Sequence, residues 1–226
     1  MTRAAVPRRA RATRRQCVHW LLVGALPAVP IGRRTPAANA TPVARPAEPI
    51  TRLFPAAAQL PAGLEPGGSG GRASVAEVVG TFSNPRDAAQ LLAGWGWVGN
   101  AYRIYVPGPG AEAGTPARVE ISLHQFASST GAAYALPYFA HDRAVALQQP
   151  EGPTELLRPC VATVRGTREA THYLRRGNLV ARITVVMPEA TPGDAGQQAL
   201  TIATELALAV SDNADDSPAG SGARCG

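Results

Sequence analysis

Histidine is the side chain in this sequence best suited to acid–base chemistry, and His124, His141 and His172 follow residue 40. His124 shares the polar face of a predicted strand with Glu120 and Ser122, so a hydrolase or redox enzyme could assemble a site from His124, Glu120 and distant residues. The sequence has no His-x-Glu, His-x-x-x-His or His-Glu-x-x-His spacing. It therefore predicts no metal site.

Nucleophile and cofactor motifs are also missing from the sequence. Ser69, Ser128 and Ser129 lack the Gly-x-Ser-x-Gly setting of a hydrolase nucleophile. The glycine-rich stretches at 67–71 and 108–110 do not continue into Gly-Lys-Ser/Thr, and the chain contains no lysine. We therefore expect no cofactor and no catalytic residues.

The clearest local pattern is a predicted β-hairpin over residues 169–187. β-Branched and aromatic residues flank Gly177-Asn178, a pair that tolerates the positive φ of a two-residue turn. Pairing Arg176 with Leu179 places His172 opposite Ile183 on the core side. We therefore expect His172 to be a buried structural residue.

The other face of this hairpin is polar, with Tyr173 opposite Arg182. A tyrosine and two arginines on an open sheet face could hold an anionic or aromatic ligand. The alternative is that they form cross-strand pairs on a solvated face, and a one-residue slip in register would exchange the two faces. The predicted ligand-binding residues are Tyr173, Arg175, Arg182 and Arg103.

The remaining patterns supply the elements that must position these residues. Trp95 and Trp97, on either side of Gly96, are expected to pack in the core rather than stack on a ligand. Pro137 lies inside one predicted helix and is expected to bend or split it. The order of the predicted strands and helices along the chain indicates an α+β fold. We expect an antiparallel or mixed sheet of about five to six strands, with about three helices packed mainly on one face. The expected strands are 75–82, 97–106, 118–126, 160–164 and the two arms of the hairpin; the expected helices are 84–94, 128–147 and 194–210.

The first forty residues have the layout of an export signal. A charged start precedes the apolar run from Trp20 to Ile31, and Ala38-Asn39-Ala40 fits a cleavage site after Ala40. The run of about twelve residues is shorter than the roughly 20 that a stable membrane-spanning helix needs, so no membrane insertion is expected after cleavage. Arg14-Arg15 resembles the twin-arginine motif of the Tat pathway. The sequence thus predicts a secreted or extracytoplasmic protein exported by the Tat route.

The charge of the remaining chain excludes one class of partner. The sequence holds 22 basic residues, all arginine, and 16 acidic residues, and eight of the arginines lie in residues 1–40. Residues 41–226 therefore hold 22 − 8 = 14 arginines against 16 acids, a net charge of −2. Such a body lacks the positive field that collects nucleic acid, so no nucleic-acid partner is expected.

Cysteine usage and composition divide the mature chain. Cys17 would leave with the signal, and Cys160 and Cys225 could then pair in a compartment that permits disulfides; an intermolecular bridge or a free thiol at Cys225 is the alternative.

Residues 41–73 are rich in Pro, Ala and Gly and predict a linker. Within it, an apolar island at 50–60 predicts a short segment that docks on the domain. The predicted divisions are the signal peptide 1–40, the linker 41–73, a single domain 74–210 and a flexible tail 211–226.

Short motifs carry a resemblance to a known group of proteins: Arg52-Leu53-Phe54-Pro55 with Leu60-Pro61-Ala62-Gly63-Leu64, Trp95-Gly96-Trp97 with Asn100-Ala101-Tyr102-Arg103, and Tyr173 through Asn178. Together they resemble exported α+β domains of bacterial lipoproteins, which are similar to the extracytoplasmic sensor domains of some bacterial membrane kinases. The resemblance implies a soluble module that binds an unknown small molecule or envelope component. It supplies no catalytic residue and no oligomeric state. The other functions left open are an exported enzyme without a recognised motif and a structural cell-envelope protein.

Overall fold

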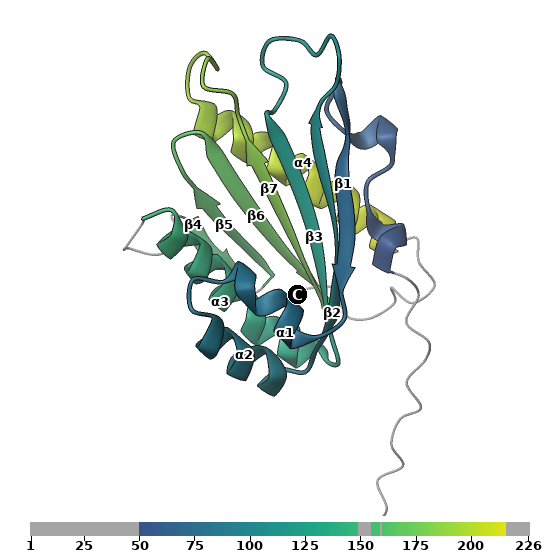
Figure 1. The fold of residues 1–226 in the computed structure, drawn as a ribbon, viewed down its shortest axis with the longest axis vertical. Coiled ribbons are helices and arrows are strands. Elements are labelled where there is room, and N and C mark those ends of the chain that lie inside the picture. Colours follow the sequence, from purple (N-terminus) through teal and green to yellow (C-terminus); the bar gives the residue numbers. More distant parts are fainter. Residues whose placement is uncertain (1–49, 149–154, 159, 216–226) are drawn as a thin grey trace, which may run out of the picture. The chain divides into compact units, whose positions relative to one another are not determined.

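The computed structural model describes residues 50–148, 155–158 and 160–215, and its centre is an antiparallel β-sheet (Figure 1). The seven strands lie in the order β1-β2-β3-β7-β6-β5-β4, with every neighbouring pair antiparallel. The predicted α+β class is confirmed, with seven strands in place of the expected five to six. The strands are β1 Leu64–Arg72, β2 Trp97–Pro107, β3 Arg118–Phe126, β4 Glu155–Arg158, β5 Val161–Arg165, β6 Glu169–Arg176 and β7 Leu179–Val186.

Two of the longer helices begin where their capping residues predict. The Asn84 side chain accepts a hydrogen bond from the backbone N–H of Asp87, and Pro85 occupies the first position of α2. The Ser128 side chain accepts from the backbone N–H of Gly131 at the start of α3. The α-helices are α1 Val75–Val78, α2 Pro85–Gly94, α3 Ser129–Ala146 and α4 Ala195–Asp215; the 3-10 helices are η1 Ile50–Leu53, η2 Ala57–Gln59 and η3 Val79–Thr81.

Helix α4 covers one face of the sheet, where the main apolar core forms. Ile121 and Ile183 from the central strands pack there with Leu206 of α4. His172 lies on this side opposite Ile183, as the hairpin register predicts, and only 8% of it is exposed. The 3-10 helix η1 also contacts α4, and Phe54, which follows η1, is buried.

On the opposite face of the sheet, the helices of the described residues cover one end only. Helices α1, α2 and α3 gather there and form a second core around Phe126, Phe139, Tyr173 and Val180. The sequence predicted helices mainly on one face, whereas α4 and the α1–α3 group lie on opposite faces. Toward Arg118 on the second face, the sheet carries polar and charged side chains.

Residues 64–72 correct the predicted linker, because they form the edge strand β1. Composition alone hides this strand, since residues 65–71 are exposed and pair with β2 through their backbone. The glycines serve a packing role at one point: a Cβ on Gly70 would come within 2.6 Å of the Tyr102 hydroxyl oxygen. The chain therefore joins the sheet ten residues before the predicted domain start at 74.

The predicted strand 75–82 is also corrected, because residues 75–81 form α1 and η3 instead of a strand. The Glu77 carboxylate accepts backbone hydrogen bonds from Ser74 at 3.0 Å and from Ala73 at 2.8 Å. Ser74-x-x-Glu77 is a capping box, and this local signal outweighs the β-branched residues that suggested a strand.

Helix α4 corrects one further prediction, and α3 excludes one of the two effects expected of Pro137. Helix α4 continues past the predicted end at Val210 to Asp215, and within the predicted tail Ser211 accepts hydrogen bonds from Arg176. Helix α3 runs as one element from Ser129 to Ala146 with Pro137 inside it, so the proline does not split the helix.

Candidate functional site

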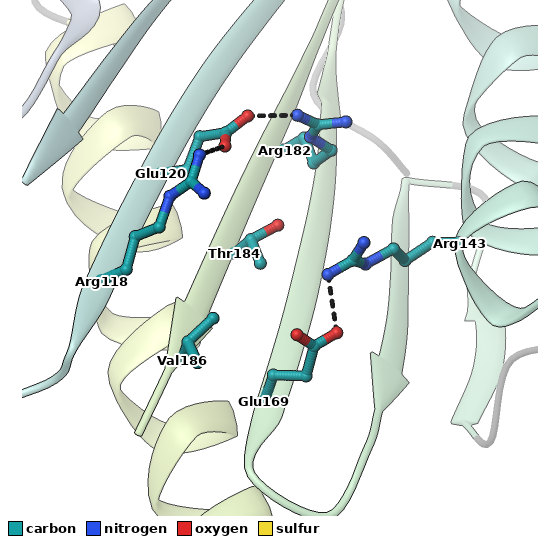
Figure 2. A pocket seen from close by; sticks show the side chains of 7 residues that line it. All are labelled: Arg118, Glu120, Arg143, Glu169, Arg182, Thr184 and Val186. Carbon is teal, nitrogen blue, oxygen red and sulfur yellow. Dashed lines mark hydrogen bonds and ion pairs between the residues drawn. The ribbon is translucent and has the colours of Figure 1, made fainter. Parts of the chain in front are cut away.

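A polar cavity of about 170 Å³ lies beside α3 on the partly covered face of the sheet (Figure 2). Successive side chains of a strand alternate between faces, so residues two apart along β3 and β7 reach the same cavity. Helix α3 contributes a further wall. The lining residues are Arg118 and Glu120 from β3, Arg182, Thr184 and Val186 from β7, Glu169 from β6 and Arg143 from α3.

Two groups of ion pairs frame the cavity. Nη2 of Arg118 lies 2.6 Å from a carboxylate oxygen of Glu120, and Nη2 of Arg182 donates to the other oxygen of the same carboxylate. Nη2 of Arg143 donates to Glu169 over 2.6 Å. Three arginines and two glutamates leave the lining with a net charge of +1.

Two donors in this lining have no acceptor. The Nε atoms of Arg143 and Arg182 are buried and make no hydrogen bond within the described part of the chain. Their side chains are 29% and 24% exposed, so the ion pairs are only partly screened by solvent. Arg143 and Arg182 thus bring guanidinium groups to the cavity from a helix and from a strand.

A buried polar cluster occupies the same sheet face under α3. Nε1 of Trp97 lies 3.3 Å from Nδ1 of His124, and Nε2 of His124 lies 3.1 Å from Oγ of Ser122. The indole N–H can only donate, so Nδ1 must accept and the neutral ring carries its proton on Nε2. Ser122 consequently accepts from His124, and it also accepts from Asn100 Nδ2 over 3.0 Å.

This cluster does not form the catalytic pair that a serine and a histidine suggest. A base that activates Ser122 would need a free lone pair on Nε2, which carries the proton instead. Burial, and then the charges of Arg182 and Arg72, hold the pKa of His124 well below its ordinary value of 6.5. Glu120, its suggested partner, is bound by arginines at the cavity. Among the described residues, no group of three or more His, Cys, Asp and Glu could hold a metal ion.

The structure separates the predicted ligand-binding residues. Tyr173 stands opposite Arg182, as predicted, but it is only 1% exposed and its hydroxyl donates to the carbonyl of Phe139 over 3.1 Å. Helix α3 covers this part of the sheet, so the expectation of Tyr173 on an open face is wrong. Burial also raises the pKa of Tyr173 to about 12. Arg182 does line the cavity.

The other two arginines lie elsewhere. Nη2 of Arg175 is 3.2 Å from Sγ of Cys160, outside the cavity lining. Arg103 pairs with Ile121 and stacks 4.6 Å from the centre of the Phe54 ring, on the opposite side of the sheet from Arg182. The expected association of Arg103 with the polar face is therefore wrong.

Sequence reasoning missed Arg143, Glu169 and Arg118 as neighbours of Arg182. Glu169 had a signal, because extending the alternation from Tyr173 by two steps of two residues places it on the same face. Arg143 had none, since nothing local in a helix sequence shows which part of a sheet its last turn reaches.

The remaining predicted residues are mostly beyond the described ranges. Cys160 is buried and disulfide-bonded, and its pairing with Cys225 stays a prediction because Cys225 lies outside those ranges. Arg14, Arg15, Ala38 and Ala40 of the expected signal lie outside them as well. No helix in the described ranges combines the length and apolarity that crossing a bilayer requires.

Comparison with known proteins gives no matching family model and no matching curated protein. Among solved structures, the chain is similar to the extracellular domain of PknH from Mycobacterium tuberculosis, with a TM-score of 0.45 and 12% sequence identity. The alignment covers 72% of this chain and 94% of that chain. This weak structural similarity says nothing about a ligand of this chain.

Proposed function

We propose that the chain is a non-enzymatic binding domain that acts outside the cytoplasm, with the cavity beside α3 as its ligand site. The observation that carries the proposal is the convergence of charged side chains from β3, β6, β7 and α3 on one hollow of about 170 Å³. Small-molecule sites are concave and place a few polar groups so that they fix one orientation of the ligand.

The state of His124 favours binding over catalysis. The histidine nearest to a serine holds its proton toward that serine, and its low pKa keeps it neutral at physiological pH. The charged groups of the cavity are guanidinium and carboxylate groups already engaged with each other. Such a lining can orient and neutralise a ligand without forming or breaking a covalent bond.

An unbiased small-molecule screen tests the binding proposal. Spectra that correlate backbone ¹H and ¹⁵N would be recorded on the full chain with each compound in turn. We expect the strongest hits to move the signals of residues 118–120, 182–186 and 143. Hits that consistently move signals on the α4 face instead, or a screen without any hit, would contradict the proposed site.

The proposed location rests on Arg14-Arg15, the apolar run and Ala38-Asn39-Ala40. A fusion of residues 1–45 to a reporter tests it in cells with and without a working Tat system. Export that requires Tat is the expected result. Export that continues unchanged without Tat would contradict the route, and a reporter that stays inside both cell types would contradict the location.

A further inference from the structure

Two arginines of the cavity lining come from different elements. Arg182 projects from β7 and Arg143 from α3, and Figure 2 shows both guanidinium groups beside the same hollow. Each guanidinium carries five N–H donors, and its hydrogen bond to a carboxylate uses only one Nη atom. Both arginines therefore keep further donors beside the cavity.

The charge of the lining selects the sign of the ligand. Arg118, Arg143 and Arg182 carry +3, and Glu120 and Glu169 carry −2, so one negative charge makes the cavity neutral. A cationic ligand would raise the positive charge further. A phosphate dianion would overshoot neutrality, whereas a carboxylate brings one charge and two acceptor oxygens in the geometry that guanidinium groups match.

Thr184 adds a hydroxyl between the two ion pairs (Figure 2). Its Oγ1 lies 3.0 Å from Oγ1 of Thr171, and either atom can be the donor. When Thr171 donates, the hydroxyl hydrogen of Thr184 is available to a ligand in the cavity. The Thr184 hydroxyl therefore suits a ligand with hydrogen-bond acceptors, as the arginines of the lining do.

We propose that the cavity binds the carboxylate group of a small molecule, with the guanidinium groups of Arg143 and Arg182 as its donors. This inference rests on the proposed function, since it names the ligand class of the same site. The cavity volume of about 170 Å³ suits a small carboxylic acid rather than a polymer.

Acetate and acetamide form a matched pair of probes, because they share size and shape and differ in charge. Each would be titrated into the full chain at constant ionic strength and followed by the backbone signals of residues 182–186, with methylammonium as the cationic probe. We expect saturable acetate binding in the millimolar range and at least about tenfold weaker binding of the other two, the effect of losing a hydrogen bond to a charged group. Acetamide or methylammonium binding as strongly as acetate would overturn the carboxylate assignment.

Substitutions at Arg143 and Glu169, which form an ion pair, should change the affinity for acetate in opposite directions. Arg143→Gln removes one donor and one positive charge, so acetate should bind at least about tenfold more weakly. Glu169→Gln removes a negative charge from the same pair, so acetate should bind more tightly. Arg168→Gln is the matched control, because the ion pair of Arg168 with Glu189 is exposed and lies outside the cavity lining.

The outcomes separate this inference from the proposed function. If neutral or cationic compounds from the screen bind the cavity while acetate does not, the binding site stands and the carboxylate assignment fails. If neither the screen nor acetate moves a signal of a cavity residue, both the proposed function and the carboxylate assignment fail. If Arg143→Gln does not fold, Glu169→Gln still decides, since unchanged or weaker acetate binding in that variant would contradict the inference.

Discussion

The indole N–H of Trp97 donates to Nδ1 of His124 over 3.3 Å, and this contact fixes where the histidine holds its proton. Both side chains are buried, so no solvent competes for Nδ1. Ser122 therefore receives a hydrogen bond from His124 and cannot be activated by it. A serine and a histidine in contact are in this case a structural pair.

Replacing Trp97 by Phe should remove that constraint. We expect the neutral ring of His124 in the unchanged protein to be protonated at Nε2, and we expect the free energy of unfolding of Trp97→Phe to fall by about 1–3 kcal/mol, because a buried acceptor is left unpaired. Ring ¹⁵N shifts report the tautomer, and urea unfolding reports the stability. Protonation at Nδ1 in the unchanged protein would contradict the assignment.

His172 should make the fold sensitive to acid. Burial lowers its pKa from 6.5 to about 4, so between these values the unfolded chain binds a proton that the folded protein does not. The contribution of His172 to the free energy of unfolding is therefore fully present above pH 6.5. It falls by about 3 kcal/mol as the pH drops toward 4. His124 should add to the loss, since its pKa is also lowered.

Urea unfolding over that pH range, for the unchanged protein and His172→Gln, measures the effect. The variant should lose stability less steeply as the pH falls. Parallel curves for the two proteins would show that His172 does not contribute to the acid sensitivity.

Tyr173→Phe distinguishes a structural tyrosine from a ligand-binding one. The variant loses the hydroxyl that donates to the Phe139 carbonyl, so its free energy of unfolding should fall by about 0.5–1.5 kcal/mol. Its affinity for acetate should not change, because Tyr173 does not line the cavity. Unchanged stability together with weaker acetate binding would return Tyr173 to the site.

Two glycines in helices should respond in opposite ways to alanine. A Cβ on Gly131 in α3 would lie 2.0 Å from the backbone oxygen of Trp95, so the substitution should destabilise the fold by about 1–3 kcal/mol in spite of the better helix propensity of alanine. A Cβ on Gly94 in α2 meets nothing within 4 Å. Gly94→Ala should therefore stabilise the protein by up to about 1 kcal/mol. Equal effects in thermal unfolding would contradict the close approach of α3 to Trp95.

The hairpin shows how far local sequence patterns reach. A period of two residues and the turn at Gly177-Asn178 are enough to place Tyr173 opposite Arg182 and His172 opposite Ile183, as the structure has them. The same alternation cannot show that α3 covers Tyr173 and stops short of Arg182. Which part of the sheet a helix covers depends on tertiary packing. The predicted polar face is therefore divided between the core, at Tyr173, and the cavity, at Arg182.

The edge of the sheet shows a different limit. Strand β1 is held by backbone hydrogen bonds to β2 and buries almost no side chain, so hydrophobic patterning gives no sign of it. The capping box at Ser74 and Glu77, in contrast, can be recognised in the sequence, and it begins α1 in spite of the β-branched residues around it.

The Nε–H signals of Arg143 and Arg182 give the most direct test of the binding site. They would be assigned in ¹H–¹⁵N spectra of the full chain by their loss in Arg143→Gln and Arg182→Gln, and then followed during an acetate titration. The account predicts that both signals shift together and saturate at one acetate concentration, while the Nε–H signal of Arg168 does not move. Saturable acetate binding that leaves both signals unmoved, or the absence of any saturable binding, would contradict it.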